Sequence, residues 1–313
     1  MSHIVITNCT SRKRLDAAPV TMPPSASYPN IASAVALWQA TSRTAHRSRL
    51  VRYLYLGRSV AEAIKVSDTL GANLYVASAG LGLAHALDPA PSYDLTFADP
   101  ANSLARCLVE HGWTPADWWM ALTRAGVGRG PIASLFQNSS SGLVFVALPA
   151  AYVDMISADL LAVPERQRER LRLFTSAAGQ RALGAALRPC ALPYDERLET
   201  VSGYAGTRTD FPQRALRHFV DVIGGHQLGL ADGAERVAGA LEGLQPRAVS
   251  SGTKLTDEAI ADVLRTAWDV HGGSSTRLLR YLRHEARIAC EQKRFRGIWY
   301  AVKGEYDNKE SAV

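Results

Sequence analysis

Short apolar runs rich in β-branched residues alternate along this chain with stretches of helical periodicity. The runs are Ile4–Thr7, Leu74–Ala77, Leu143–Leu148 and Leu171–Phe174, with a weaker fifth at Cys190–Leu192. They carry little polar alternation, which is typical of strands covered on both faces. We therefore predict an α/β fold with three layers and a mostly parallel sheet of four or five strands.

Helical periodicity fills the intervals between these runs. The predicted helices are Ser59–Leu70, Asn102–Glu110, Pro115–Arg124, Ala151–Leu161 and Ala177–Leu187. Ligands of parallel sheets bind where the strands end at their carboxyl side. The positions that follow the five runs are Asn8–Cys9, Ser78–Gly80, Pro149–Ala150, Thr175–Ser176 and Pro193–Tyr194.

A change in composition near residue 245 predicts a domain boundary. The chain has 313 residues, which suits two domains or one large domain with an appendage. The segment Gln245–Gly252 is rich in Pro, Ser and Gly and is predicted to be a linker. We expect an α/β catalytic domain over residues 1–245, a basic module over 253–303 and a flexible tail over 304–313.

The basic module has the outline of a helix–turn–helix. Thr256 is a predicted N-cap for a first helix, and the segment His271–Ser274 breaks it. Ser275 is expected to cap a second helix, and Gly297–Tyr300 is interpreted as a small β wing. The module's predicted DNA contacts are its cations, namely Arg277, Arg280, Arg283, Arg287, Lys293, Arg294 and Arg296. A one-faced set of arginines after such a turn fits phosphate contact and groove insertion, although a solvated helix face has the same pattern.

Composition and cysteine spacing exclude several classes of protein. The formal net charge of +6 permits a polyanionic partner. Cys9, Cys107, Cys190 and Cys290 are far apart and form no CxxC pair, so we expect free thiols and no metal site. The N-terminus lacks the features of a signal peptide, and no apolar run reaches the ~18 residues of a membrane span. We expect a cytoplasmic protein that does not bind membranes.

Polar residues directly after the first run form the first candidate motif, Thr7–Lys13. Asn8 carries an amide that can contact a base edge or hold a water. Arg12 and Lys13 are expected to hold a phosphate. Cys9 is a possible nucleophile, but no histidine in the sequence is an obvious partner for it. An ordinary polar turn remains the alternative interpretation.

The second candidate motif joins Ser78–Leu83 to Pro91–Asp94. Gly80 allows a ligand to approach the backbone closely. Tyr93 is expected to stack on a base, and the Asp94 carboxylate to orient water or stabilise an oxocarbenium-like sugar. A turn with a buried tyrosine ring is the alternative. A third, glycine-containing stretch near residues 201–209 contributes Arg208 as a further DNA contact.

Together the two motifs, Ile6–Lys13 and Ser78–Asp94, resemble an α/β family related to uracil-DNA-glycosylase-like and peroxide-stress-protein domains. With a basic C-terminal module, the chain resembles the anti-phage DNA glycosylases, which excise glucosylated hydroxymethylcytosine from modified phage DNA. The resemblance implies hydrolysis of an N-glycosidic bond in double-stranded DNA, which leaves an abasic site, without a cofactor. The GQDPYH motif of uracil-DNA glycosylases is absent, so the group that activates water is left open.

The resemblance also implies roles for single residues. Asn8 and Asp94 are the expected catalytic residues. The expected base pocket consists of Cys9, Ser78, Gly80, Tyr93 and Ser176. Two other functions stay open from the residues alone: a non-catalytic DNA-binding regulator whose α/β domain senses a nucleotide, and a nucleoside hydrolase or transferase that acts on small molecules.

Overall fold

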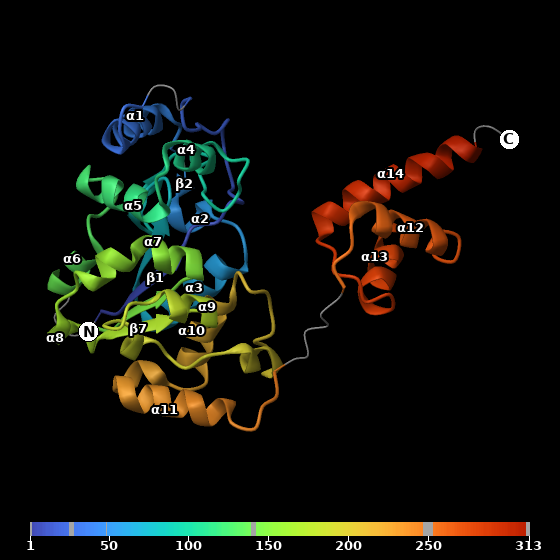
Figure 1. The fold of residues 1–313 in the computed structure, drawn as a ribbon. Helices are drawn as coiled ribbons and strands as arrows, with labels where there is room; N and C mark the ends of the chain where they lie inside the picture. The colour runs from blue at the N-terminus through green and yellow to red at the C-terminus, as the bar shows by residue number, and fades with distance from the viewer. Residues whose placement is uncertain (1, 25–27, 48, 139–141, 247–252, 311–313) are drawn as a thin grey trace. The chain divides into compact units, whose positions relative to one another are not determined.

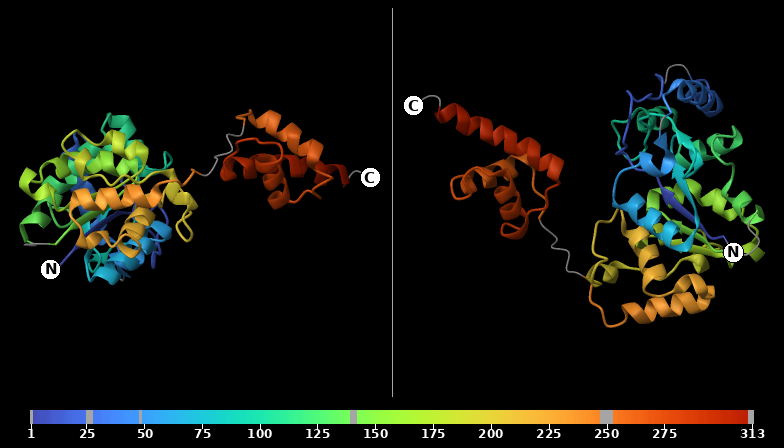
Figure 2. Two further views of the ribbon diagram at one scale, coloured as in Figure 1. Left: turned by 90° about the horizontal axis from the view of Figure 1, so that it is seen from below. Right: turned by 180° about the vertical axis from the view of Figure 1, so that it is seen from behind.

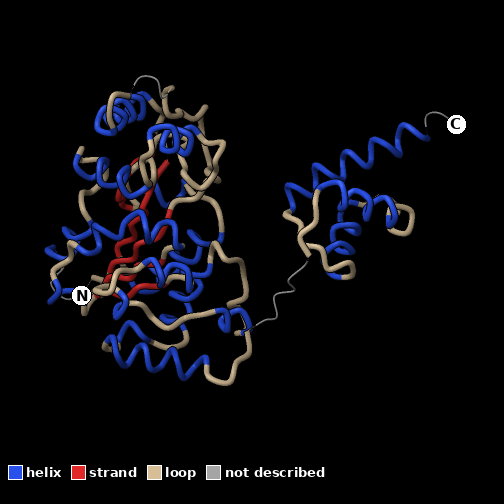
Figure 3. The backbone as a smooth tube through the Cα atoms, in the orientation of Figure 1, coloured by secondary structure: helices blue, strands red, loops and turns tan. Residues whose placement is uncertain are grey.

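A computed structural model describes residues 2–24, 28–47, 49–138, 142–246 and 253–310. Its contacts divide the chain into two compact units, Met1–Arg247 and Ala248–Val313, and we describe each by itself. The strands all belong to the first unit, as the red segments of Figure 3 show for the described part of the chain.

A five-stranded sheet in the order β4-β3-β1-β6-β7 forms the centre of the first unit. Its strands are β1 (Ile4–Asn8), β3 (Asn73–Ser78), β4 (Gly82–His85), β6 (Val144–Ala147) and β7 (Leu171–Phe174). The pairs β1–β3, β1–β6 and β6–β7 are parallel, whereas β3–β4 is antiparallel. The predicted α/β class with a mostly parallel sheet is therefore confirmed.

Helices cover both faces of this sheet (Figure 1). In β1, Ile4 and Ile6 belong to one apolar cluster and Val5 to another, as the alternation of side chains along a strand requires. The Val5 face packs against α3 (Arg58–Leu70), α10 (Phe211–Asp221) and α11 (Leu230–Leu241). The opposite face packs against α1 (Ile31–Thr44), α5 (Pro115–Arg124), α7 (Ala150–Leu161) and the segment that follows α9 (Ala177–Ala182).

The long connections after β1 and β4 build additional structure on the sheet. They contain α2 (Val51–Leu54), α4 (Ser103–His111) and a two-stranded sheet of β2 (Arg49–Leu50) and β5 (Pro89–Ala90). The helices α1 and α11 lie at opposite ends of the first unit, both in Figure 1 and in the right-hand view of Figure 2. Two short helices, α6 (Ile132–Asn138) and α8 (Glu165–Arg168), complete the unit.

Two details of the predicted sheet were wrong. Cys190–Leu192 is not a strand of the sheet, because Cys190 ends a 3-10 turn and only Ala191 forms a bridge, to Leu173. The fifth strand is instead β4, which follows β3 after a tight turn. The predicted helix Ala177–Leu187 is also shorter and ends at Ala182.

The described residues of the second unit form three helices, α12 (Asp257–Ala267), α13 (Ser275–His284) and α14 (Gln292–Glu310). They surround an apolar core of their own, which includes Ile260, Leu264, Leu282 and Phe295. The Thr256 hydroxyl accepts a hydrogen bond from the Ala259 amide at 3.3 Å, so the predicted N-cap is confirmed.

Three predictions for this unit were wrong. Ser274, not Ser275, occupies the N-cap position of α13, and its side chain makes no capping hydrogen bond. The segment Gly297–Tyr300 is helical rather than a β wing. The predicted tail 304–313 is helical as far as Glu310, because α14 continues through it; residues 311–313 lie outside the described part.

Among the described residues, no helix combines the length and apolarity needed to cross a membrane. All four cysteines are buried free thiols.

Candidate functional site

Asn8 ends the central strand, but its side chain is held inside the protein. It is 6% exposed, its Oδ1 accepts a hydrogen bond of 2.9 Å from Gln213 Nε2, and its Nδ2 donates one of 2.8 Å to the Cys9 carbonyl. Gln213, on α10, also donates to the Thr7 hydroxyl and the Ala147 carbonyl. The Gln213 amide thus ties the ends of β1 and β6 together, and it fixes the orientation of Asn8.

Ser78 and Tyr93 form a buried network of hydroxyl groups. The Tyr93 hydroxyl lies 2.7 Å from Ser78 Oγ and 2.6 Å from the Tyr55 hydroxyl, and both Ser78 and Tyr93 are fully buried. Burial raises the pKa of Tyr93 and Tyr55, so both phenols are neutral at physiological pH. In this conformation Tyr93 is a core residue and offers no surface on which a base could stack.

The segment Ala79–Gly80 is fixed by contacts to two tryptophans. The Trp38 indole donates to the Gly80 carbonyl and the Trp118 indole to the Ala79 carbonyl, each at 2.7 Å. A Cβ at position 80 would overlap the Tyr93 ring. Gly80 is therefore required by packing against Tyr93, rather than by the approach of a ligand.

Cys9 is also buried and contacts Tyr152 on α7. The Cys9 sulfur lies 3.0 Å from the Tyr152 hydroxyl, which also donates to the Cys9 carbonyl at 3.2 Å. The Tyr152 ring packs against Phe97, with 4.9 Å between the ring centroids. The described residues place no histidine against the Cys9 sulfur, and a role for Cys9 as a nucleophile gains no support.

Lys13 is the most unusual charged residue in this region. Its Nζ has essentially no accessible surface and no hydrogen-bond partner among the described residues, and it lies 4.6 Å from the centroid of the Tyr93 ring. Burial lowers the pKa of the Lys13 ammonium, while the charge of the Asp94 carboxylate opposes that shift. An unpaired buried amine is energetically costly, and such groups are concentrated at functional sites.

Asp94 lies one residue after Tyr93 and is partly exposed. Its backbone amide donates to the Val20 carbonyl, but no described residue donates a hydrogen bond to its carboxylate. The carboxylate lines a polar cavity of about 560 Å³ with Asn102, Arg106 and Glu110. This volume lies within the range of about 300–1,000 Å³ that is usual for small-molecule sites.

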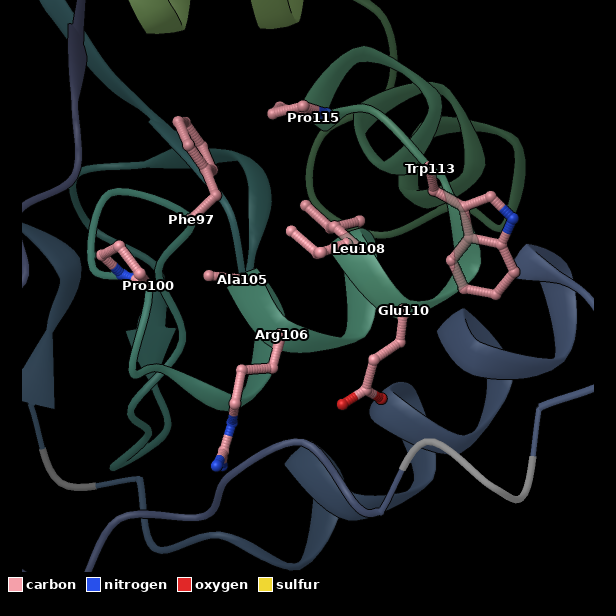
Figure 4. A pocket seen from close by; sticks show the side chains of 9 residues that line it. Phe97, Pro100, Ala105, Arg106, Leu108, Glu110, Trp113 and Pro115 are labelled. Carbon is pink, nitrogen blue, oxygen red and sulfur yellow. The ribbon is translucent and has the colours of Figure 1, made fainter.

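A second, more apolar cavity of about 450 Å³ lies along the same helix, α4. Phe97, Leu108 and Pro115 gather on one side of α4, whereas the side chains of Arg106 and Glu110 extend from its other side (Figure 4). Asp94 does not line this apolar cavity. We therefore place the candidate site in the polar cavity, because of the two cavities along α4 it is the one in which the Asp94 carboxylate lies with an arginine.

The remaining predicted residues of the first unit lie in different surroundings. Ser176 is the N-cap of α9, and its hydroxyl accepts from the Gly179 amide, so its side chain is already engaged. Arg12 and Arg208 are exposed, as expected for contacts to phosphate. Lys13 is not exposed, and its amine does not reach solvent in this conformation.

The cations of the second unit fall into two groups. Arg283 donates to the Cys290 carbonyl, and Arg294 pairs with Asp257 at 2.6 Å, so both stabilise the unit itself. Arg287 lies beyond the end of α13, with a φ of 52°, so the prediction that the arginines after the turn share one helix face is wrong for this residue. The exposed cations of the predicted set are Arg277, Arg280, Arg287, Lys293 and Arg296.

In the described part of the chain, no group of three or more His, Cys, Asp or Glu side chains could hold a metal ion. Comparisons with protein-family models, with curated proteins and with solved structures find no match to this chain. The candidate site is therefore argued from its own geometry.

The sequence interpretation missed the residues that organise this site. Gln213 lies 205 positions from Asn8 in the sequence, and its role depends entirely on the packing of α10. Arg106 and Glu110 share a face of α4 because they are four residues apart, a spacing visible in the sequence. Their proximity to Asp94 follows only from the fold.

Proposed function

We propose that this protein is a DNA glycosylase that hydrolyses the N-glycosidic bond of a modified base and leaves an abasic site. The sequence resemblance suggests glucosylated hydroxymethylcytosine in phage DNA as the substrate, and anti-phage defence in the cytoplasm as the role. On this proposal, the first unit is a uracil-DNA-glycosylase-like domain, and the second unit is a helix–turn–helix-like module that binds double-stranded DNA.

One observation carries the proposal: two residues of the predicted motifs, Lys13 and Asp94, have charged groups without a hydrogen-bond partner among the described residues, and Asp94 lines a polar cavity with Arg106. Both belong to the motifs that follow the ends of parallel strands, where ligands of such sheets bind. Asp94 opens into a cavity large enough for a nucleotide. The Asp94 carboxylate and the Arg106 guanidinium beside this cavity have the charges needed to stabilise, respectively, a sugar cation and a departing anionic base.

The chemistry assigned to these groups follows from those charges. When the bond between C1′ and the base nitrogen breaks, positive charge develops on the sugar and negative charge on the departing base. The Asp94 carboxylate would stabilise the sugar cation and accept a proton from the water whose oxygen bonds to C1′. The Arg106 guanidinium, which lines the same cavity, would stabilise the departing base, which takes up a proton from solvent as it leaves. The charge of Lys13 would add to this effect from its buried position, without contact to the base.

Asn8 is given an indirect role in this proposal. Its amide oxygen is already bonded to Gln213, and its side chain is buried. We therefore assign Asn8 to the positioning of the β1 carboxyl end, in place of the direct catalytic role expected from the sequence. The peptides that follow it lead directly to Lys13.

The second unit is the proposed means of holding DNA. A base must leave the stack before its glycosidic bond can be reached, which costs a few kcal/mol. Phosphate contacts by exposed cations such as Arg277 and Arg280 would offset this cost. Their positions at the start of α13, after a glycine-containing turn, suit the second helix of a helix–turn–helix.

The test is to incubate the full-length protein with phage DNA that contains glucosylated hydroxymethylcytosine, and separately with unmodified DNA, before treatment with alkali. We expect strand breaks at abasic sites in the modified DNA alone. Asp94→Asn should slow base release by about 10²-fold or more, whereas Asp232→Asn, at an exposed position on α11, should leave the rate unchanged. Absence of breaks in both DNAs would refute the proposal.

A truncated chain that ends at residue 247 separates this function from a small-molecule activity. The first unit has its own apolar core and excludes the residues beyond Arg247. If the protein acts on DNA, truncation should strongly reduce base release from DNA. If it acts on free nucleosides, truncation should leave their hydrolysis intact.

A further inference from the structure

The helix α14 carries an exposed stripe that combines cations with an aromatic ring. At ~100° per residue, Lys293, Arg296, Tyr300 and Lys303 fall within about 80° of the helix circumference. All four are exposed, and Tyr300 keeps 61% of its surface accessible. We call these four residues the α14 stripe.

The α14 stripe lies outside the apolar core of the second unit, although Trp299 contacts two of its members. The Trp299 ring lies 5.6 Å from Lys303 Nζ and 5.0 Å from the Tyr300 ring centroid. The core contacts of α14 come from Phe295, Ile298 and Val302, which lie on the opposite side of the helix. Of the carboxylates near this helix, Glu305 pairs with Arg265, and Asp307 lies one turn beyond Lys303, at the end of the stripe. Within the described residues, no carboxylate pairs with the three cations of the stripe.

The alternative surface, on α13, offers fewer free cations in a regular array. Arg277 and Arg280 are exposed, but Arg283 donates to the Cys290 carbonyl and Arg287 lies outside the helix. The described part of α13 also presents no aromatic side chain as exposed as Tyr300. The α14 stripe therefore has more free charge than α13, and it is the only one of the two surfaces with a strongly exposed ring.

We propose that the α14 stripe binds a DNA strand with an unpaired base, with its cations on the phosphates and Tyr300 stacked on the base. This inference rests on the DNA-binding part of the proposed function. Positive charge favours any polyanion, but a ring between cations is the arrangement that recognises an unstacked base. At a rise of 1.5 Å per residue, the stripe spans about 15 Å from Lys293 to Lys303, enough for several phosphates.

The test measures binding of the full-length protein to fluorescein-labelled oligonucleotides by fluorescence anisotropy. The probes are a single-stranded 25-mer and the same sequence as a duplex, each titrated at several salt concentrations. One variant carries Lys293→Gln, Arg296→Gln and Lys303→Gln together, and a second carries Arg277→Gln and Arg280→Gln. A third removes equal charge from exposed sites on the first unit, with Lys65→Gln, Arg124→Gln and Arg236→Gln.

The α14 triple variant should bind the single strand at least 30-fold more weakly than the wild type does. The magnitude of its slope of log K against log salt should be smaller by about 2, because each of the three lost phosphate contacts accounts for about 0.7. The first-unit variant should change affinity less than threefold. Tyr300→Ala should weaken single-strand binding about tenfold, and Tyr300→Phe should restore it. Thermal unfolding should be the same for all variants, because every substituted side chain is exposed.

Two outcomes would overturn the inference. One is an α14 triple variant that binds like the first-unit variant while the α13 variant loses affinity. The other is a Tyr300→Ala variant that binds the single strand as well as the wild type does. Neither readout needs base release, so a protein that binds through α14 but excises no base would refute the proposed function alone.

Discussion

Lys13→Met is the substitution that most sharply separates function from stability in this structure. Methionine has nearly the length and shape of the lysine stem, so it keeps the contact with the Tyr93 ring without an amine. The wild-type amine is buried without a hydrogen-bond partner among the described residues. We therefore expect the variant to be more stable than the wild type and to be impaired in base release.

The size of the effect follows from two opposing contributions. A buried donor without a partner costs about 1–3 kcal/mol. The contact between the Lys13 amine and the Tyr93 ring, 4.6 Å apart, returns about 0.5–2 kcal/mol when the amine is charged. The net expectation is a gain of about 1 kcal/mol in the free energy of unfolding, which raises the melting temperature by about 2–4 °C in a unit of this size.

The assay is urea unfolding of both proteins from pH 7 to pH 9.5. Because burial lowers the pKa of Lys13 in the folded protein, the unfolded chain binds a proton at Lys13 more strongly than the folded chain does, up to the ordinary lysine pKa of 10.5. The wild type should therefore gain stability as the pH rises toward that value, and Lys13→Met should lose this part of the slope. Lys65→Met, at an exposed site on α3, is the matched control and should change stability by less than about 0.5 kcal/mol.

Either of two results would refute this reasoning. If Lys13→Met destabilises the protein by more than 1 kcal/mol, the amine is stabilised by its surroundings and is not held there against a cost. If the variant is more stable but releases base at the wild-type rate, Lys13 has no part in the chemistry.

Three further predictions concern the scaffold of the site. Gly80→Ala should lower the free energy of unfolding by about 2 kcal/mol, because the new Cβ would overlap the Tyr93 ring. The control Gly239→Ala, in open space on α11, should raise the free energy of unfolding by up to about 1 kcal/mol. Equal effects of the two substitutions in thermal unfolding would contradict this packing argument. Gln213→Met should cost about 3 kcal/mol in urea unfolding, because three buried acceptors lose their donor, and a loss below 1 kcal/mol would show that they find other partners. Burial raises the pKa of Tyr28 to about 12, so the stability that the neutral phenol contributes is complete below pH 10 and is lost as the pH rises toward 12. The urea midpoint should therefore fall less between pH 9 and pH 11 in Tyr28→Phe than in the wild type. An equal fall in both proteins would contradict the assignment.

The central strands were predictable because their apolar runs are continuous, as strands buried on both faces require. The edge strand β4 could not be predicted from the sequence. Its four residues follow β3 after a tight turn, and they form a strand only through antiparallel pairing with Tyr75–Ser78. The run Cys190–Leu192 had the right composition but only one residue next to β7. Short apolar runs at a sheet edge thus carry too little local information to be assigned.

The rule that ligands bind at the carboxyl ends of parallel strands selected the two motifs in the sequence, and Asp94 of the second motif lines the polar cavity. The state of each side chain was not predictable, because it depends on distant partners. Tyr93 is buried by Tyr55 and Ser78, and Asn8 is held by Gln213. A motif in the sequence therefore does not by itself give the burial or the partners of each residue in it.

The prediction of a β wing at Gly297–Tyr300 was wrong because tertiary packing makes this segment helical. Glycine and aromatic residues disfavour a helix, but a glycine within a helix costs only about 1 kcal/mol. In α14 this cost is outweighed by the burial of Phe295, Ile298 and Val302 along one side of the helix. Tertiary packing thus decided the structure of this segment.

The most direct test of the proposed function is mass spectrometry of the material released from glucosylated phage DNA by the full-length protein. The proposal predicts a free modified base, in amounts that match the abasic sites in the DNA, and release about 10²-fold or more slower from Asp94→Asn. Release of nucleotides or of free glucose, or of no material at all from DNA that the protein binds, would contradict it.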